Sequence, residues 1–170
     1  MSDTTFAAAE ATAADVQSTP AFVHLRTHSE YSVVDGIIRI KDLVNQAKAF
    51  NQPALALSDL GNLFGYIKFY RAARQAGIKP IAACDFWIDN PQDDKKPNRC
   101  LLIARNHEGY LQLCRLISKS WIDNPQIDRG QLKVEWLEDT EETSGLIMLS
   151  GARQGDIGQA LEVGRYEQAL

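Results

Sequence analysis

Apolar residues gather in five short runs along the chain, and turn-forming or polar residues bound each run. Short runs rich in branched and aromatic residues are typical of β-strands. The second run, "PALALSD", is apolar at consecutive positions, as expected of a strand covered on both faces. The predicted strands are residues 21–28, 53–59, 80–88, 100–104 and 145–150.

Between these runs, apolar residues are spaced three or four positions apart, which is the period of an amphipathic helix. Gly77 and Pro80 end the second such segment, because neither residue continues a helix well. Helices are predicted over residues 40–50, 62–77, 107–121 and from 155 onward. The expected buried faces are Ile40, Leu43, Val44 and Ala47 in the first helix, Leu63, Ile67, Tyr70 and Ala73 in the second, and Tyr110, Leu113, Cys114 and Ile117 in the third.

Strands that alternate with helices predict an α/β fold with a parallel sheet, either doubly wound or closed as a barrel. Five βα units do not complete an eight-unit barrel, and the last amphipathic segment lacks a capping residue, so we expect part of a longer domain. Residues 1–20 are rich in alanine, threonine and serine and show no apolar period, which predicts a flexible extension. The folded part is expected over residues 21–170.

Composition narrows the classes of function. The chain has a formal net charge of −4, whereas a protein that binds the phosphate backbone of nucleic acids normally presents a basic face. We therefore expect this segment to contact a protein partner rather than DNA. Three cysteines without CxxC spacing indicate free thiols in a cytoplasmic protein, not disulfides or a zinc cluster. No targeting or membrane-spanning segment is predicted.

Three predicted strands end in side chains that could share one site, namely His28, Asp59 and Asp85. The loops that follow parallel strands converge at one edge of the sheet, so these side chains are expected to meet there. Taken alone, such a pattern more often marks groups that cap helices or order turns. His24, Arg26 and His28 occupy every second position of the first predicted strand and therefore share one face. His24 is expected in the core.

The residues around these positions resemble a known family. The blocks that carry the resemblance are "FVHLRTHSEYSVVDG", "PALALSDLGNLFG", "AGIKPIAACDFWI", "NHEGYLQLCRLISKSW" and "GLIMLSGARQGDIG". In this order they are similar to the N-terminal polymerase and histidinol phosphatase (PHP) domain of bacterial replicative DNA polymerase III alpha subunits. The similarity covers residues 22–160 and implies the N-terminal part, about five βα units, of a distorted (β/α)7 barrel.

The resemblance also implies a site. In members with an intact site, the first block carries histidine, any residue and histidine, the second an aspartate-histidine pair and the third a glutamate, and these groups hold divalent metals. This sequence has Arg26, Leu60 and Asp85 at three of the five positions, and His28 and Asp59 remain. Leucine donates no lone pair, and arginine stays protonated. We therefore predict a vestigial metal site without catalytic residues, in which Arg26 pairs with Asp59 or Asp85.

The resemblance further implies a part in DNA replication. The segment would be a non-catalytic scaffold that docks the proofreading exonuclease subunit and other replisome subunits, while DNA is contacted through the rest of the parent chain. No cofactor is expected in this segment. The divalent metal of the DNA-directed DNA polymerase, a nucleotidyltransferase, is expected in a separate polymerase domain. The alternative is an active metal-dependent phosphoesterase or 3′-5′ exonuclease, against which Arg26 and Leu60 argue.

Overall fold

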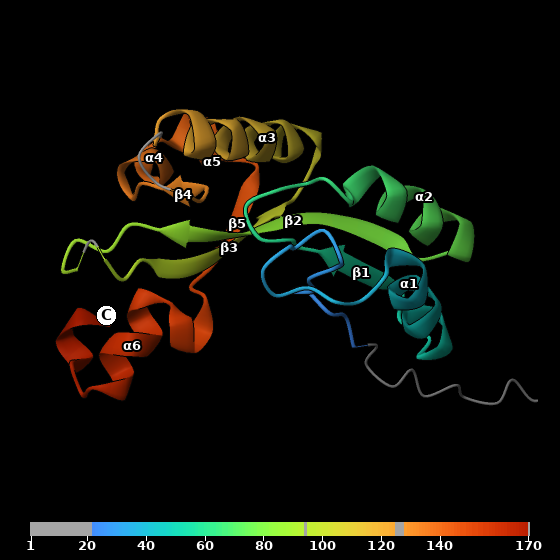
Figure 1. Ribbon diagram of the computed structural model, residues 1–170, viewed down its shortest axis with the longest axis horizontal. Coiled ribbons are helices and arrows are strands. Elements are labelled where there is room, and N and C mark those ends of the chain that lie inside the picture. Colours follow the sequence, from blue (N-terminus) through green and yellow to red (C-terminus); the bar gives the residue numbers. More distant parts are fainter. Residues whose placement is uncertain (1–21, 94, 125–127, 170) are drawn as a thin grey trace, which may run out of the picture.

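One mixed sheet with helices on both sides forms the centre of the molecule (Figure 1). The computed structural model describes residues 22–93, 95–124 and 128–169, so the extension predicted for residues 1–20 lies outside the described residues. The strands are β1 (Ala54–Leu57), β2 (Lys79–Ile88), β3 (Asn98–Ala104), β4 (Gln131–Leu132) and β5 (Leu146–Leu149). The helices are α1 (Ile40–Ala49), α2 (Tyr66–Ala76), α3 (His107–Ile122), α4 (Glu135–Glu138), α5 (Thr140–Thr143) and α6 (Asp156–Glu162), with 3-10 turns at Ala152–Gln154 and Tyr166–Gln168.

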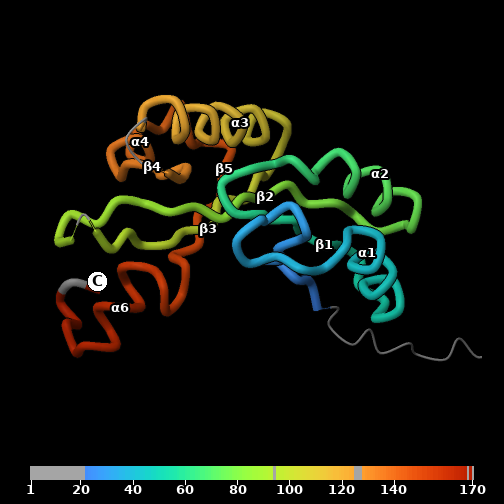
Figure 2. The backbone as a smooth tube through the Cα atoms, viewed as in Figure 1, coloured from blue at the N-terminus to red at the C-terminus, as the bar shows by residue number. Residues whose placement is uncertain are grey.

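The prediction of a parallel sheet is correct at one end of the sheet and wrong at the other. Strands β1 and β2 are parallel, because α2 lies between them and returns the chain to the same end of the sheet. Strand β3 is antiparallel to both β2 and β5. The described residues between β2 and β3, 89–93 and 95–97, contain no helix, and β2 and β3 pair antiparallel as a long hairpin (Figure 2). The sheet order is β1-β2-β3-β5, with β4 paired to the end of β2.

The strand predicted over residues 21–28 is wrong for the described residues, since no regular strand forms there. Residues 22–28 run beside β1, where the backbone N–H groups of Ala56 and Ser58 donate to the carbonyls of His24 and Thr27. The backbone N–H of Thr27 donates to the hydroxyl of Ser58 rather than to a backbone carbonyl. A side chain therefore takes a bond that a strand ladder would need, and the segment stays irregular.

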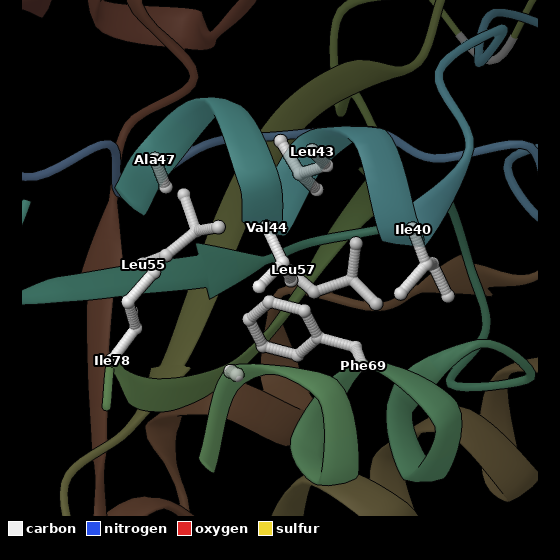
Figure 3. Packing of buried hydrophobic residues seen from close by; sticks show 9 residues of the cluster. Ile40, Leu43, Val44, Ala47, Leu55, Leu57, Phe69 and Ile78 are labelled. Carbon is white, nitrogen blue, oxygen red and sulfur yellow. The ribbon is translucent and has the colours of Figure 1, made fainter. Parts of the chain in front are cut away.

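Helix α1 and strand β1 are buried as the hydrophobic pattern predicts. The four residues predicted for the buried face of α1 are all buried, and β1 is buried at every position. Figure 3 shows these side chains meeting Leu55, Leu57 and Phe69 between α1, β1 and α2. A second core cluster, built around Phe86, Leu102 and Leu113, packs α3 onto β2 and β3.

The buried face predicted for α2 is correct at Ala73 and wrong at Ile67 and Tyr70. Phe69 and Ala73 are the buried residues of this helix, whereas Ile67 and Tyr70 are 56% and 45% exposed. The helix turns Phe69 toward β1, and this rotation leaves Ile67 and Tyr70 lining a groove of about 640 Å³. We call it the apolar groove; it is also lined by Leu25, Ile81, Ile103, Tyr110, Ile147 and Leu149.

Two further sequence predictions have clear outcomes. The cysteines at 84, 100 and 114 are free thiols, and burial raises the pKa of Cys100 to about 12. His24 is exposed rather than in the core, and its ring lies nearly perpendicular to the ring of Phe22, with ring centroids 4.7 Å apart. None of the described helices has the length and apolar character needed to cross a bilayer.

Candidate functional site

Asp85 is the centre of the candidate site. It lies in the middle of β2 with no exposed surface, and its Oδ2 atom accepts from three cationic side chains. Arg26 donates from Nε at 2.7 Å and places a terminal nitrogen at 2.6 Å. A terminal nitrogen of Arg99 lies at 2.9 Å, and His28 Nε2 at 3.0 Å. Burial opposes ionisation of this carboxyl, but the bonds from His28 and Arg99 and the arginine charges lower the pKa of Asp85.

His28 lies between two carboxylates. Its Nε2 faces Asp85, and its Nδ1 lies 2.8 Å from Oδ1 of Asp35. A neutral imidazole carries one N–H, so donation to both carboxylates requires the charged ring. Burial disfavours that charge, yet the hydrogen bonds to Asp85 and Asp35 raise the pKa of His28 above its ordinary value. The geometry thus favours the charged form of His28.

Arg99 is a member of the site that sequence reasoning missed. Its guanidinium carbon lies 4.3 Å from the centre of the Trp87 ring, and its terminal nitrogen lies 3.7 Å from Oδ2 of Asp35. In the β2–β3 register Trp87 is paired with Arg99, which explains the stacking. The available signal was a charged residue directly before the apolar run of residues 100–104. Without the direction of β3, that signal could not be assigned to Asp85.

Asp59 is turned away from the three cations. Its two carboxylate oxygens accept from Ser29, from the backbone N–H at 2.6 Å and from the hydroxyl at 2.9 Å. Burial raises the pKa of Asp59 despite these bonds. Asp59 therefore anchors the start of the loop after residue 28. Its link to Asp85 is a backbone bond, from the Asp85 N–H to the Asp59 carbonyl at 3.2 Å.

The structure thus divides the five predicted site positions into two groups. Arg26, His28 and Asp85 meet through their side chains. Asp59 and Leu60 lie next to Asp85 through the backbone, and the Leu60 N–H donates to the hydroxyl of Ser32 at 3.0 Å. The expected meeting of His28, Asp59 and Asp85 side chains is therefore only partly formed, because Ser29 occupies both oxygens of Asp59.

The donor set does not fit the divalent metals that PHP-type sites hold. Within residues 22–93, 95–124 and 128–169, His, Cys, Asp and Glu side chains form no group of three or more arranged to hold a metal ion. The Asp85 oxygen that faces the site already carries two guanidinium groups and the His28 ring. Two unit charges 4 Å apart interact by about 4 kcal/mol at an effective dielectric constant of 20, so a dication would be repelled by each arginine by about twice that amount.

The charged side chains of the site pair with one another. The carboxylates of Asp35 and Asp85 bind the side chains of Arg26, Arg99 and His28. These side chains come from the N-terminal segment, the following loop, β2 and β3. The site therefore ties four separate parts of the chain together at one end of the sheet.

Comparison with known proteins assigns the class of this fold and site. The family model described as "PHP domain" matches residues 24–170, and the chain therefore belongs to the PHP domain family. Among curated proteins, the chain is similar to DNA polymerase III subunit alpha of Neisseria meningitidis, with 45% identity over 151 residues. It is also similar to DNA polymerase III subunit alpha of Escherichia coli strain K12, with 43% identity over 149 residues.

These relatives are much longer than the chain. The match covers 88% of this chain but 13% of the Neisseria protein, and 85% of this chain but 12% of the Escherichia protein. The chain thus spans about one eighth of the length of the curated relatives it matches. Among solved structures, an amidohydrolase from Chromobacterium violaceum matches with a TM-score of 0.46 and 18% identity, over 58% of this chain and 32% of that one. A likeness at that level does not bear on function.

Proposed function

We propose that this chain is the PHP portion of a replicative DNA polymerase III alpha subunit and that it acts there as a scaffold without hydrolytic activity. The two sequence relatives named above support the parent protein, because both are alpha subunits of DNA polymerase III. The main support for the lack of hydrolytic activity is that two guanidinium groups, those of Arg26 and Arg99, pair with Asp85. A hydrolytic PHP site needs a metal where these two cations lie.

The activity of the parent protein would be templated DNA synthesis in the bacterial cytoplasm, as part of the replisome. The divalent metals for that reaction would belong to a polymerase domain outside this chain. The net charge of −4 agrees with a segment that contacts protein partners while other parts of the parent protein hold the DNA.

The sheet would form part of a distorted (β/α)7 barrel. The apolar groove supports this proposal, because Ile147 and Leu149 of β5 are 46% and 40% exposed although they lie in the sheet. Strand β5 pairs with β3 and leaves apolar side chains that another layer would bury. In the parent protein, which is much longer in the relatives, further barrel strands and helices would cover this groove.

The lack of hydrolysis is tested with the intact protein. Wild-type protein with Mn²⁺ should release no phosphate-ester product from p-nitrophenyl phosphate and should not shorten a mismatched primer. His28→Ala serves as the matched control, since it removes the one histidine in the site. Turnover by the wild type that His28→Ala abolishes would refute the scaffold and favour a metal-dependent phosphoesterase or exonuclease.

The proposed partner is the proofreading exonuclease subunit. A polymerase whose PHP domain lacks metal chemistry would need a separate subunit to remove mismatched nucleotides. Chemical cross-linking of the intact protein with that exonuclease, followed by mass spectrometry, tests the docking. Exposed lysines on described elements, such as Lys68 and Lys119, offer attachment points. Cross-links confined to other parts of the parent protein would refute docking here.

A further inference from the structure

Arg99 lies where a cation would bridge the two carboxylates of the site. One of its terminal nitrogens is 2.9 Å from Oδ2 of Asp85 and 3.7 Å from Oδ2 of Asp35. We propose that Arg99 is the resident cation of this site and that it excludes divalent metals independently of Arg26. This inference rests on the proposed non-hydrolytic function and adds the residue that enforces it.

The two arginines are held very differently. The side chain of Arg26 is 39% exposed and belongs to the irregular segment before the first loop, so moving it into solvent would break its bonds to Asp85 but would take no buried side chain out of the protein. Arg99 is 5% exposed, belongs to the central strand β3, and stacks on the ring of Trp87. Moving Arg99 aside would break the stacking and two ion pairs inside the protein. Arg99 is therefore the more firmly held of the two cations that keep a metal away from Asp85.

In the described residues the side chains around Arg99 are not arranged as a metal site. Without the charge of Arg99, however, the carboxylates of Asp35 and Asp85 would face one another and repel, and a dication would draw them together. The Arg99 guanidinium faces Oδ2 of Asp35 and Oδ2 of Asp85. The same oxygen of Asp85 also contacts Nε2 of His28. The second oxygen of Asp85, Oδ1, is buried and has no hydrogen-bond partner among the described residues, so it remains free to coordinate. Carboxylate oxygens with one imidazole suit Mn²⁺ and Zn²⁺.

The test measures Mn²⁺ binding to the intact protein by calorimetry, in four variants compared with the unaltered protein. The variants are Arg26→Gln, Arg26→Gln with Arg99→Met, Arg26→Gln with Arg99→Lys, and the exposed-residue control Arg153→Met. Methionine keeps a long side chain over Trp87 without charge, and lysine keeps the charge. Any Mn²⁺ bound elsewhere in the protein is present in every sample, so the difference from the unaltered protein counts ions at this site.

The Arg26→Gln, Arg99→Met protein should bind one more equivalent of Mn²⁺ than the unaltered protein. Arg26→Gln alone, the Arg99→Lys double variant and the control should bind no additional ion. Additional binding by Arg26→Gln alone, or by the Arg99→Lys protein, would overturn the role of Arg99 while leaving the scaffold proposal intact. Mn²⁺ binding by the unaltered protein that is lost in an Asp85→Asn variant would instead overturn the scaffold proposal itself.

Folding is followed in the same samples by thermal melting with and without Mn²⁺. The Arg26→Gln, Arg99→Met protein should melt at a lower temperature without Mn²⁺ and recover with it, because the ion would replace the lost charge beside Asp85. Failure to fold even with Mn²⁺ present, or a melting temperature that Mn²⁺ does not change, counts against the proposal.

Discussion

At the scale of single residues, Asp85 organises the site, and the sequence indicated only part of its surroundings. The family pattern drew attention to Arg26 and His28, which do contact Asp85. Arg99 was missed, since its link to Asp85 depends on β3 running antiparallel to β2, and no local pattern gives that direction. Asp59 was expected in the same cluster, but bonds from Ser29 hold it apart. Side-chain partners of this kind follow from tertiary structure, not from spacing.

The first prediction concerns the charge of Asp85. Asp85→Asn should lower the free energy of unfolding by about 3 kcal/mol or more, because it leaves the buried Arg99 without its main partner. Chemical denaturation measures the change. Glu162→Gln is the matched control, since it weakens the exposed pair with Arg153 and should change stability by about 0.5 kcal/mol or less. Equal effects of the two substitutions would contradict the account.

The second prediction concerns pH and His28. The folded-state pKa of His28 lies above the ordinary value of 6.5, so its stabilisation is complete below that pH and is lost as pH rises through the raised value. The urea concentration at the midpoint of unfolding should therefore decrease as the pH rises above 6.5. The lowered pKa values of Asp35 and Asp85 act only in the acid range, where their stabilisation is lost as pH falls. His28→Gln should flatten the slope above pH 6, and an unchanged slope would refute the assignment.

At the scale of elements, periodicity predicted which segments form helices and strands better than how they pair. Helix α1 and strand β1 follow the apolar pattern, because a strong stripe and a fully apolar run each have one favourable burial. The predicted parallel direction of β3 was wrong, and so was the predicted burial of Ile67 and Tyr70 on α2. Both depend on neighbours distant in the chain, which an isolated pattern does not encode.

The third prediction tests the contact between α3 and the start of β5. A Cβ atom at Gly109 would lie 1.9 Å from the carbonyl oxygen of Gly145, so the backbone would have to move. Gly109→Ala should lower the free energy of unfolding by about 2 kcal/mol or more. Gly77→Ala is the control: Gly77 has φ of 79° and open space around it, and its loss should cost about 1 kcal/mol. A smaller effect at Gly109 than at Gly77 would contradict this packing.

At the scale of the whole molecule, the apolar groove is the main feature that the hydrophobic pattern did not predict. The exposed Ile67 and Tyr70 of α2 face it together with Ile147 and Leu149 of β5. A patch of this kind on a soluble protein normally binds another surface. In the isolated chain the groove would be open, whereas in the parent protein the proposed barrel would cover it.

The fourth prediction follows from that exposure. The 170-residue chain studied alone should self-associate as its concentration rises, and light scattering after size-exclusion chromatography measures the mass. Ile147→Ser with Leu149→Ser should reduce the association, because both side chains line the groove. Val33→Ser, in an exposed loop outside the groove, should leave it unchanged. A compact monomer at every concentration would show that the groove needs no cover.

The proposed lack of hydrolysis depends on Arg26 and Arg99 lying beside Asp85, where a divalent metal would otherwise bind. Crystals of the unaltered protein grown with Mn²⁺, measured for anomalous scattering at the manganese edge, test it most directly. The account predicts no manganese peak beside Asp85 and an Arg99 terminal nitrogen within hydrogen-bond distance of its Oδ2 atom. A manganese peak bridging Asp35 and Asp85, with the guanidinium groups of Arg26 and Arg99 moved aside, would contradict it.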